Sequence, residues 1–234
     1  MNNKQPKKAS LPGTVELLKR TWQIYKEKFL VLTGIMLIPF TLRIIFGASS
    51  IIFTGTVSFV LVIIGVVLSL FFAFWASLAV IYAVGERNHK GDIKESFLKP
   101  YKKIGRLGIV SILTLLIVLG GFIFLIIPGI IFSIWYGFSM FIAIFEDTYG
   151  MKALSRSKKL VSGYAMDVFL KYFAGGLIVL VIVLIPKIIT AFLLGNDLSG
   201  DIFSLFLSPF FVIYSFLIYE ELKKIKGNIP TETI

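Results

Sequence analysis

The sequence contains no cysteine and only one histidine, His89, among its 234 residues. Without cysteine there are no disulfides, no thiol catalysis and no cysteine-based metal site. His89 stands alone in Asn88-His89-Lys90, which supports neither a metal site nor a general base. A phosphate loop, a dinucleotide fingerprint and a Ser-His-Asp set are also absent. We therefore expect no catalytic residue, no cofactor and no metal, and a protein that is not an enzyme.

Charged residues are missing from long stretches of the chain. Residues 51–85 (35 residues) and 107–145 (39 residues) contain no Asp, Glu, Lys or Arg. A membrane-spanning helix needs about 20 apolar residues. The composition is 57% hydrophobic, whereas soluble domains are usually about 45–50% apolar. These runs exclude a soluble core and predict an integral membrane protein.

Acidic residues are scarce beside basic ones, 13 against 24, for a net charge of +11. A basic chain can bind nucleic acid, but here the basic residues flank the apolar runs and form no soluble basic face. Lys and Arg in such positions set membrane topology and meet anionic headgroups. The expected partners are therefore membrane lipids, with a membrane protein partner also open, and not nucleic acid.

Six spans are predicted: 29–48, 56–85, 107–126, 130–146, 168–195 and 202–220. Run 51–85 has no interior turn signal, so we expect one long tilted helix starting at Thr54-Gly55-Thr56. Run 107–145 is divided at Pro128-Gly129, because proline removes a helical N–H and glycine permits a turn. The fold class is all-α integral membrane, with one domain over 13–221 and tails at 1–12 and 222–234.

The basic residues also predict the orientation of these spans. Twenty-one of the 24 Lys and Arg lie before the first span, after the last span, or in the loops between spans two and three and between spans four and five. Only Arg43 and Lys187 lie toward the other side, and Lys171 lies near the inner end of span five. This asymmetry predicts cytoplasmic termini in a plasma-membrane protein.

The spans form a threefold internal repeat. Each copy has a basic amphipathic segment, two apolar runs and a closing glutamate: Glu86, Glu146 or Glu221. Aligning these glutamates superposes small residues spaced four apart in the even spans: Gly65, Ser69, Ala73 and Ser77; Gly129, Ser133 and Gly137; Ser204 and Ser208. Small residues let helices approach closely in lipid, so we expect the even spans to pack centrally.

Each hairpin is preceded by a segment with helical apolar periodicity. The first carries Val15, Leu18, Trp22, Tyr25 and Phe29, the third Met151, Leu154, Leu160, Val161 and Tyr164, and the middle one contains Pro100. Lysines and arginines are interspersed. We expect three helices lying flat in the cytoplasmic headgroup layer.

The chain resembles the membrane domain attached to some bacterial glycerophosphoryl diester phosphodiesterases. The similarity lies in Trp22-Gln23-Ile24-Tyr25, Glu86-Arg87 and Gly91, Pro128-Gly129-Ile130, Glu146, and the segment from Gly150 to Leu160, and it covers about 14–221. It implies a six-helix prokaryotic membrane domain. It does not carry over phosphodiesterase activity, because the catalytic domain with its His-Arg pair is not in this sequence.

Six residues are candidates for a functional or structural role. Glu86, Glu146 and Glu221 are expected at helix C-termini, where a carboxylate opposes the helix dipole. In a structural role they would pair with basic residues such as Arg156 and Arg106 or cap the N-terminus of an amphipathic helix. In a functional role they would form a cytoplasmic ring that contacts headgroups, an ion or a partner. Arg43 and Lys187 are intramembrane charges. They either snorkel outward toward Asp197 and Asp201 or bind an anionic headgroup.

Three functions remain open from the sequence. The first is a non-catalytic protein that organises the membrane or handles lipid through its basic segments and small-residue faces. The second is a transporter, or a transporter subunit, with a site at the repeat interface. The third is an intramembrane enzyme that acts on lipid headgroups through the cytoplasmic glutamates.

Overall fold

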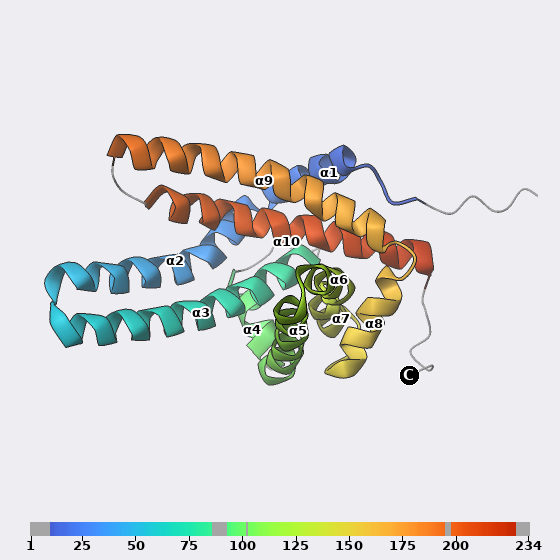
Figure 1. Cartoon of the computed structure of the whole chain (residues 1–234), viewed down its shortest axis with the longest axis horizontal. Helices are drawn as coiled ribbons and strands as arrows, with labels where there is room; N and C mark the ends of the chain where they lie inside the picture. Colours follow the sequence, from blue (N-terminus) through green and yellow to red (C-terminus); the bar gives the residue numbers. More distant parts are fainter. Residues whose placement is uncertain (1–9, 86–92, 102, 195–197, 228–234) are drawn as a thin grey trace, which may run out of the picture. The chain divides into compact units, whose positions relative to one another are not determined.

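The computed structural model describes residues 10–85, 93–101, 103–194 and 198–227, and the regular structure in this part of the chain is all α-helical. Figure 1 shows the helices in chain order. They are α1 (Thr14–Glu27), α2 (Phe29–Ile52), α3 (Gly55–Gly85), α4 (Ile93–Tyr101), α5 (Ile104–Phe124), α6 (Ile126–Tyr136), α7 (Ser139–Phe145), α8 (Met151–Val161), α9 (Ala165–Leu194) and α10 (Leu198–Lys226).

Five stretches of the described residues are long and apolar enough to cross a membrane: Phe29–Ala48, Gly55–Gly85, Ile104–Phe124, Ile126–Phe145 and Leu205–Lys226. Only 6% of the apolar window in Gly55–Gly85 is buried inside the protein. In water such a continuous exposed apolar surface would drive association, whereas lipid tails solvate it. These helices are those of a multi-pass membrane protein. The predicted fifth span, 168–195, falls on the 30-residue helix α9.

The chain folds into two compact units, each built from segments that are distant in the sequence. The first unit contains Met1–Arg20, Gly105–Gly175 and Ser215–Ile234. The second unit contains Thr21–Ile104 and Gly176–Tyr214. Helices α1, α9 and α10 each contribute one part to each unit.

In the second unit, α2 and α3 form an antiparallel hairpin (Figure 1). The prediction of one long helix that starts at Thr54-Gly55-Thr56 is confirmed: α3 starts at Gly55 (φ +66°) and continues for 31 residues, about 46 Å. A Cβ at Gly65 would lie 2.2 Å from Cβ of Phe46, so glycine is what allows the two helices to approach here. At the other end of the hairpin, the Lys28 ammonium donates a hydrogen bond to the Ala83 carbonyl near the end of α3.

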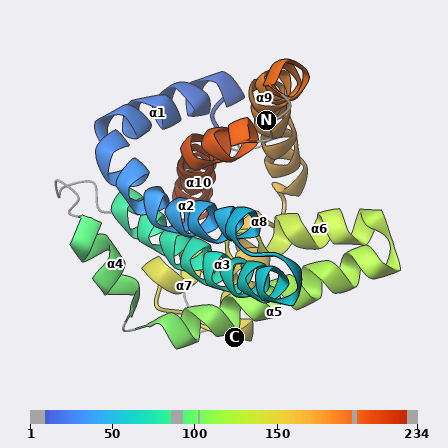
Figure 2. The same ribbon diagram turned by 90° about the vertical axis from the view of Figure 1, so that its left-hand side faces the viewer.

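In the first unit, α5 and α6 follow one another and meet at the turn that joins them (Figure 2). The break between these helices is not where the sequence predicted it. The interruption is at Leu125, which is extended (φ −163°, ψ 151°), and Pro128 lies in the first turn of α6. Proline is tolerated there because first-turn N–H groups have no intrahelical acceptor. The Pro-Gly pair instead serves packing: a Cβ at Gly121 would lie 3.0 Å from Cα of Gly129.

The closing glutamates are not equivalent. Glu146 ends α7, and its N–H donates to the Ile142 carbonyl at 2.8 Å. Glu221 was predicted at a helix end, which is wrong, because α10 continues to Lys226. The same extension makes residues 222–226, expected in the C-terminal tail, helical. Glu86 lies outside the described residues.

The segments expected in the headgroup layer bury much of their apolar side in the protein. In α8, Leu154, Leu160 and Val161 are buried, whereas Met151 is exposed. In α1, Tyr25 is buried while Val15 and Trp22 are exposed. Buried Leu17 and Thr21 lie four residues apart on the side of α1 that carries Tyr25. Protein packing thus uses part of the surface that the sequence assigned to lipid.

Candidate functional site

A cavity of about 580 Å³ lies in the second unit among α2, α3 and α10. This volume is within the range of ligand pockets, about 300–1,000 Å³. The lining comes from one face of each helix, at spacings of three and four residues. Helix α2 contributes Met36, Pro39, Phe40, Arg43, Phe46 and Gly47; α3 contributes Val62, Gly65, Val66, Ser69, Leu70 and Ala73; α10 contributes Leu205 and Ser208.

Some of the small residues that are spaced four apart in the even-numbered spans are part of this lining. We refer to each such row of small residues as a stripe. In α3, Gly65, Ser69 and Ala73 are the first three stripe positions, and Ser208 is a stripe position in α10. Gly65 makes the close contact with Phe46, whereas small side chains at the other positions leave space. In the first unit, Gly129 contacts Phe122 and Gly121 of its own hairpin partner. The stripes therefore serve hairpin packing at some positions and a cavity at others.

Among the described residues that line this cavity, Arg43 is the one with a charged side chain. Two hydroxyl groups accompany it. The Ser69 Oγ is buried and makes no hydrogen bond among the described residues, and the Ser208 Oγ lies 3.5 Å from the Met36 sulfur. The remaining walls are apolar, so the cavity offers one cation, two hydroxyl groups and a hydrocarbon surface.

Lys187, which like Arg43 was expected either to snorkel outward or to bind an anionic headgroup, belongs to α9, but its side chain lies outside the described residues. The same is true of Asp201, while Asp197 is not described at all. The backbone places Asp201 within the first turn of α10. Both alternatives for Lys187, snorkelling outward and binding a headgroup, therefore stay predictions.

A second polar cluster lies in the first unit around Glu146. Arg156 of α8 donates from Nε to Glu146 Oε2 at 2.9 Å, which is the pairing suggested for these two residues. Tyr219 of α10 donates to Oε1 at 2.9 Å, and the Lys223 ammonium lies 3.4 Å from the same oxygen. The Glu146 and Arg156 side chains are 10% and 6% exposed. The carboxylate is thus held by three side chains from two helices of the first unit, α8 and α10.

This environment shifts the titration of Glu146. Burial raises the pKa of the carboxyl. The hydrogen bonds from Arg156 and Tyr219, together with the charges of Arg156 and Lys223, lower the pKa by a larger amount. The net pKa lies below the ordinary glutamate value, and the group is ionised at neutral pH. A buried ion pair of this kind fixes geometry and is costly to break. We interpret it as an anchor that joins α7, α8 and α10.

The other basic and acidic candidates have separate neighbours. Glu221 accepts hydrogen bonds from Arg20 at 3.1 Å and Lys224 at 2.9 Å. Arg106, suggested as a partner for a glutamate, lies 5.5 Å from the ring of Tyr149 in a cation–π contact. No group of three or more Asp, Glu or His residues suited to a metal occurs within the described ranges.

Sequence reasoning missed Tyr219 and Lys223 as partners of Glu146. Their spacing of four residues on α10, which puts both side chains on one helix face, was the available signal. It also missed the two serines of the cavity as a pair, although both belong to the stripes. Comparison of the chain with protein-family models, curated proteins and solved structures finds no match.

Proposed function

We propose that this protein is a non-catalytic, multi-pass membrane protein that binds an anionic lipid in the cavity among α2, α3 and α10. The observation that carries the proposal is a single arginine in the lining of an otherwise mostly apolar cavity. An anionic headgroup suits Arg43, and acyl chains suit the apolar walls. The hydroxyl of Ser69 would donate to a phosphate or ester oxygen.

The proposed topology is six spans in three hairpin repeats. Helix α9 is the sixth spanning helix beside the five stretches described above, and the basic loops face the cytoplasm, which also holds both termini. Helices α1, α4 and α8 lie at the cytoplasmic surface. The location is the plasma membrane of a prokaryote, in line with the resemblance to the phosphodiesterase membrane domain.

Native mass spectrometry of the full chain from mild detergent, with extraction and identification of retained lipid, tests this function. We expect wild type to retain an anionic phospholipid and Arg43→Ala to lose it. A hydrogen bond to a charged group contributes about 1.5–3 kcal/mol, so affinity should fall roughly tenfold or more. Arg43→Lys should retain part of the binding.

Arg106→Ala is the matched control, because Arg106 lies in the first unit against Tyr149 and does not line the cavity. It should retain the lipid like wild type. If wild type carries no anionic lipid, or if Arg43→Ala retains it equally, the proposed function is wrong. The search would then turn to protein partners and transported solutes.

A further inference from the structure

A second, wholly apolar depression lies in the first unit. It has a volume of about 350 Å³ and is lined by α6 together with the start of α9. Ile127, Ile131 and Trp135 contribute from α6, and Met166 and Phe169 contribute from α9. From Ile127 to Trp135 the helix rises about 12 Å. We refer to it as the α6–α9 groove.

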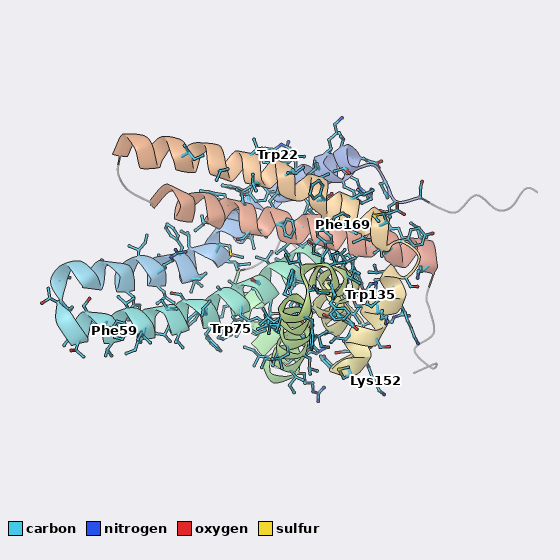
Figure 3. All side chains as sticks on the ribbon, viewed as in Figure 1. Trp22, Phe59, Trp75, Trp135, Lys152 and Phe169 are labelled. Atoms are coloured by element: carbon cyan, nitrogen blue, oxygen red, sulfur yellow. The ribbon has the colours of Figure 1, made fainter. Side chains whose placement is uncertain are left out.

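One end of the α6–α9 groove carries a positive charge. The Lys158 ammonium lies 4.3 Å from the centroid of the Trp135 ring, and Trp135 lines the groove. Lys158 is exposed, as is Lys152 on the same helix. Figure 3 shows Trp135, Phe169 and Lys152.

The position of Lys158 is fixed by its neighbour in the chain. Ser157 is fully buried, and its hydroxyl donates to the Trp135 carbonyl at 2.7 Å. The same hydroxyl accepts from the Phe138 N–H at 3.3 Å. These two bonds hold α8 against the end of α6, so the cation at the next residue stays beside the indole ring.

We propose that the α6–α9 groove binds one acyl chain of an anionic phospholipid whose phosphate contacts Lys158. Charge complementarity at the Trp135 end and a wall without polar side chains select this occupant. A lysine keeps three donors, so it can contact a phosphate while it lies over the ring. The inference rests on the membrane placement proposed above but not on Arg43, which belongs to the other unit.

Fluorescence quenching by brominated lipids tests the site directly. The full chain carries three tryptophans, so Trp22→Phe with Trp75→Phe leaves Trp135 as the reporter. The protein is placed in phosphatidylcholine vesicles containing brominated phosphatidylglycerol or brominated phosphatidylcholine. We expect the anionic lipid to occupy the position beside Trp135 about fivefold more favourably, the ratio that one lysine near a charged lipid gives.

Lys158→Gln should remove this preference, and Ala165→Phe should reduce quenching by both lipids because the added ring fills the α6–α9 groove. Lys152→Gln, on the same helix, is the matched control and should keep the preference. The inference is overturned if both lipids quench Trp135 equally or if the preference survives Lys158→Gln. It is also overturned if Trp135 in the Ala165→Phe variant is quenched as strongly as in its parent.

A second measurement covers the case in which the double tryptophan replacement does not fold. In native mass spectrometry of the otherwise unchanged chain, Lys158→Gln should bind phosphatidylglycerol about fivefold more weakly than Lys152→Gln. Equal binding by the two variants overturns the inference.

Arg43→Ala separates the two proposals. If the preference at Trp135 persists while lipid retention does not depend on Arg43, only the proposed function fails. If retention depends on Arg43 but Trp135 shows no preference, only the α6–α9 groove fails.

Discussion

The two units of the molecule place an arginine among apolar side chains in two different ways. In the first unit, Arg156 is buried, with 5% of the whole residue exposed, and its guanidinium is bound to Glu146. In the second unit, Arg43 is exposed and lines a cavity of about 580 Å³. A charge enclosed with its counter-charge stabilises one arrangement of helices. A charge on a cavity wall is accessible to a ligand. The surroundings of an arginine, not the residue type, therefore separate a structural anchor from a group that a ligand can reach.

Removing one member of the buried pair should give the largest effect. Arg156→Met leaves the Glu146 carboxylate buried without its main partner, which costs about 3–5 kcal/mol. Thermal unfolding in detergent should show this loss, and Arg43→Met should lose less stability because the Arg43 side chain is exposed and its removal leaves no carboxylate as buried as Glu146. Arg156→Met combined with Glu146→Gln should recover part of the stability. Equal losses for Arg156→Met and Arg43→Met would remove the distinction between the two arginines.

The phenol that supports the pair should have the next largest effect. Tyr219→Phe removes the hydrogen bond to Glu146 Oε1 and keeps the aromatic ring, which stacks on Phe141. A hydrogen bond to a charged group contributes about 1.5–3 kcal/mol. Chemical denaturation should show a loss of this size, and Tyr136→Phe in α6 is the control. An unchanged midpoint would mean that Arg156 and Lys223 alone satisfy the carboxylate.

Packing of the α5–α6 hairpin should be sensitive to one methyl group. In Gly121→Ala the new Cβ would lie 2.7 Å from the Phe132 ring and 3.0 Å from Cα of Gly129. Overpacking of this kind costs about 1–3 kcal/mol. Gly120→Ala is the neighbouring control, because nothing lies within 4 Å of its Cβ. Similar unfolding temperatures for these two variants would contradict the close approach of the helices.

The pH dependence of stability should show the smallest effect. The folded-state pKa of Glu146 is lowered, so its stabilising contribution is complete above the unfolded value, about 4.3. The contribution is lost as pH falls through the lower folded-state value. Thermal unfolding between pH 7 and pH 3 should show this loss in wild type and in Arg43→Ala. Glu146→Gln should lack that component, and a curve parallel to wild type would contradict the assignment.

The sequence predicted the helical class, the single long helix that starts at Thr54-Gly55-Thr56, and six spans, five of which coincide with stretches that are long and apolar enough to cross a membrane. These features depend on length and apolar content, which are properties of each segment alone. The break in run 107–145 was misplaced because Pro128 is also acceptable in a first helical turn. The helix end at Glu221 was wrong because a charged residue does not stop a helix, and Lys223, Lys224 and Lys226 favour its C-terminal turn.

The candidate site was predictable only in part. Arg43 was identified because a charge within a span is costly and therefore conspicuous. The cavity was not, because it needs Ser208 of α10 beside Met36 of α2, two residues 172 positions apart in the chain. The small-residue stripes indicated which helix faces were involved, but not whether such a face closes on a neighbour or leaves a space.

Local properties of the amino-acid sequence predict most of the helices and the stretches that can enter a membrane, because backbone hydrogen bonding and hydrocarbon solvation act on each segment separately. The spatial arrangement of the helices brings Arg156 and Tyr219 to Glu146 and puts Arg43 on the wall of a cavity. Those outcomes depend on which side chains from distant segments share the same space. Close packing settles that question, and no single segment encodes it.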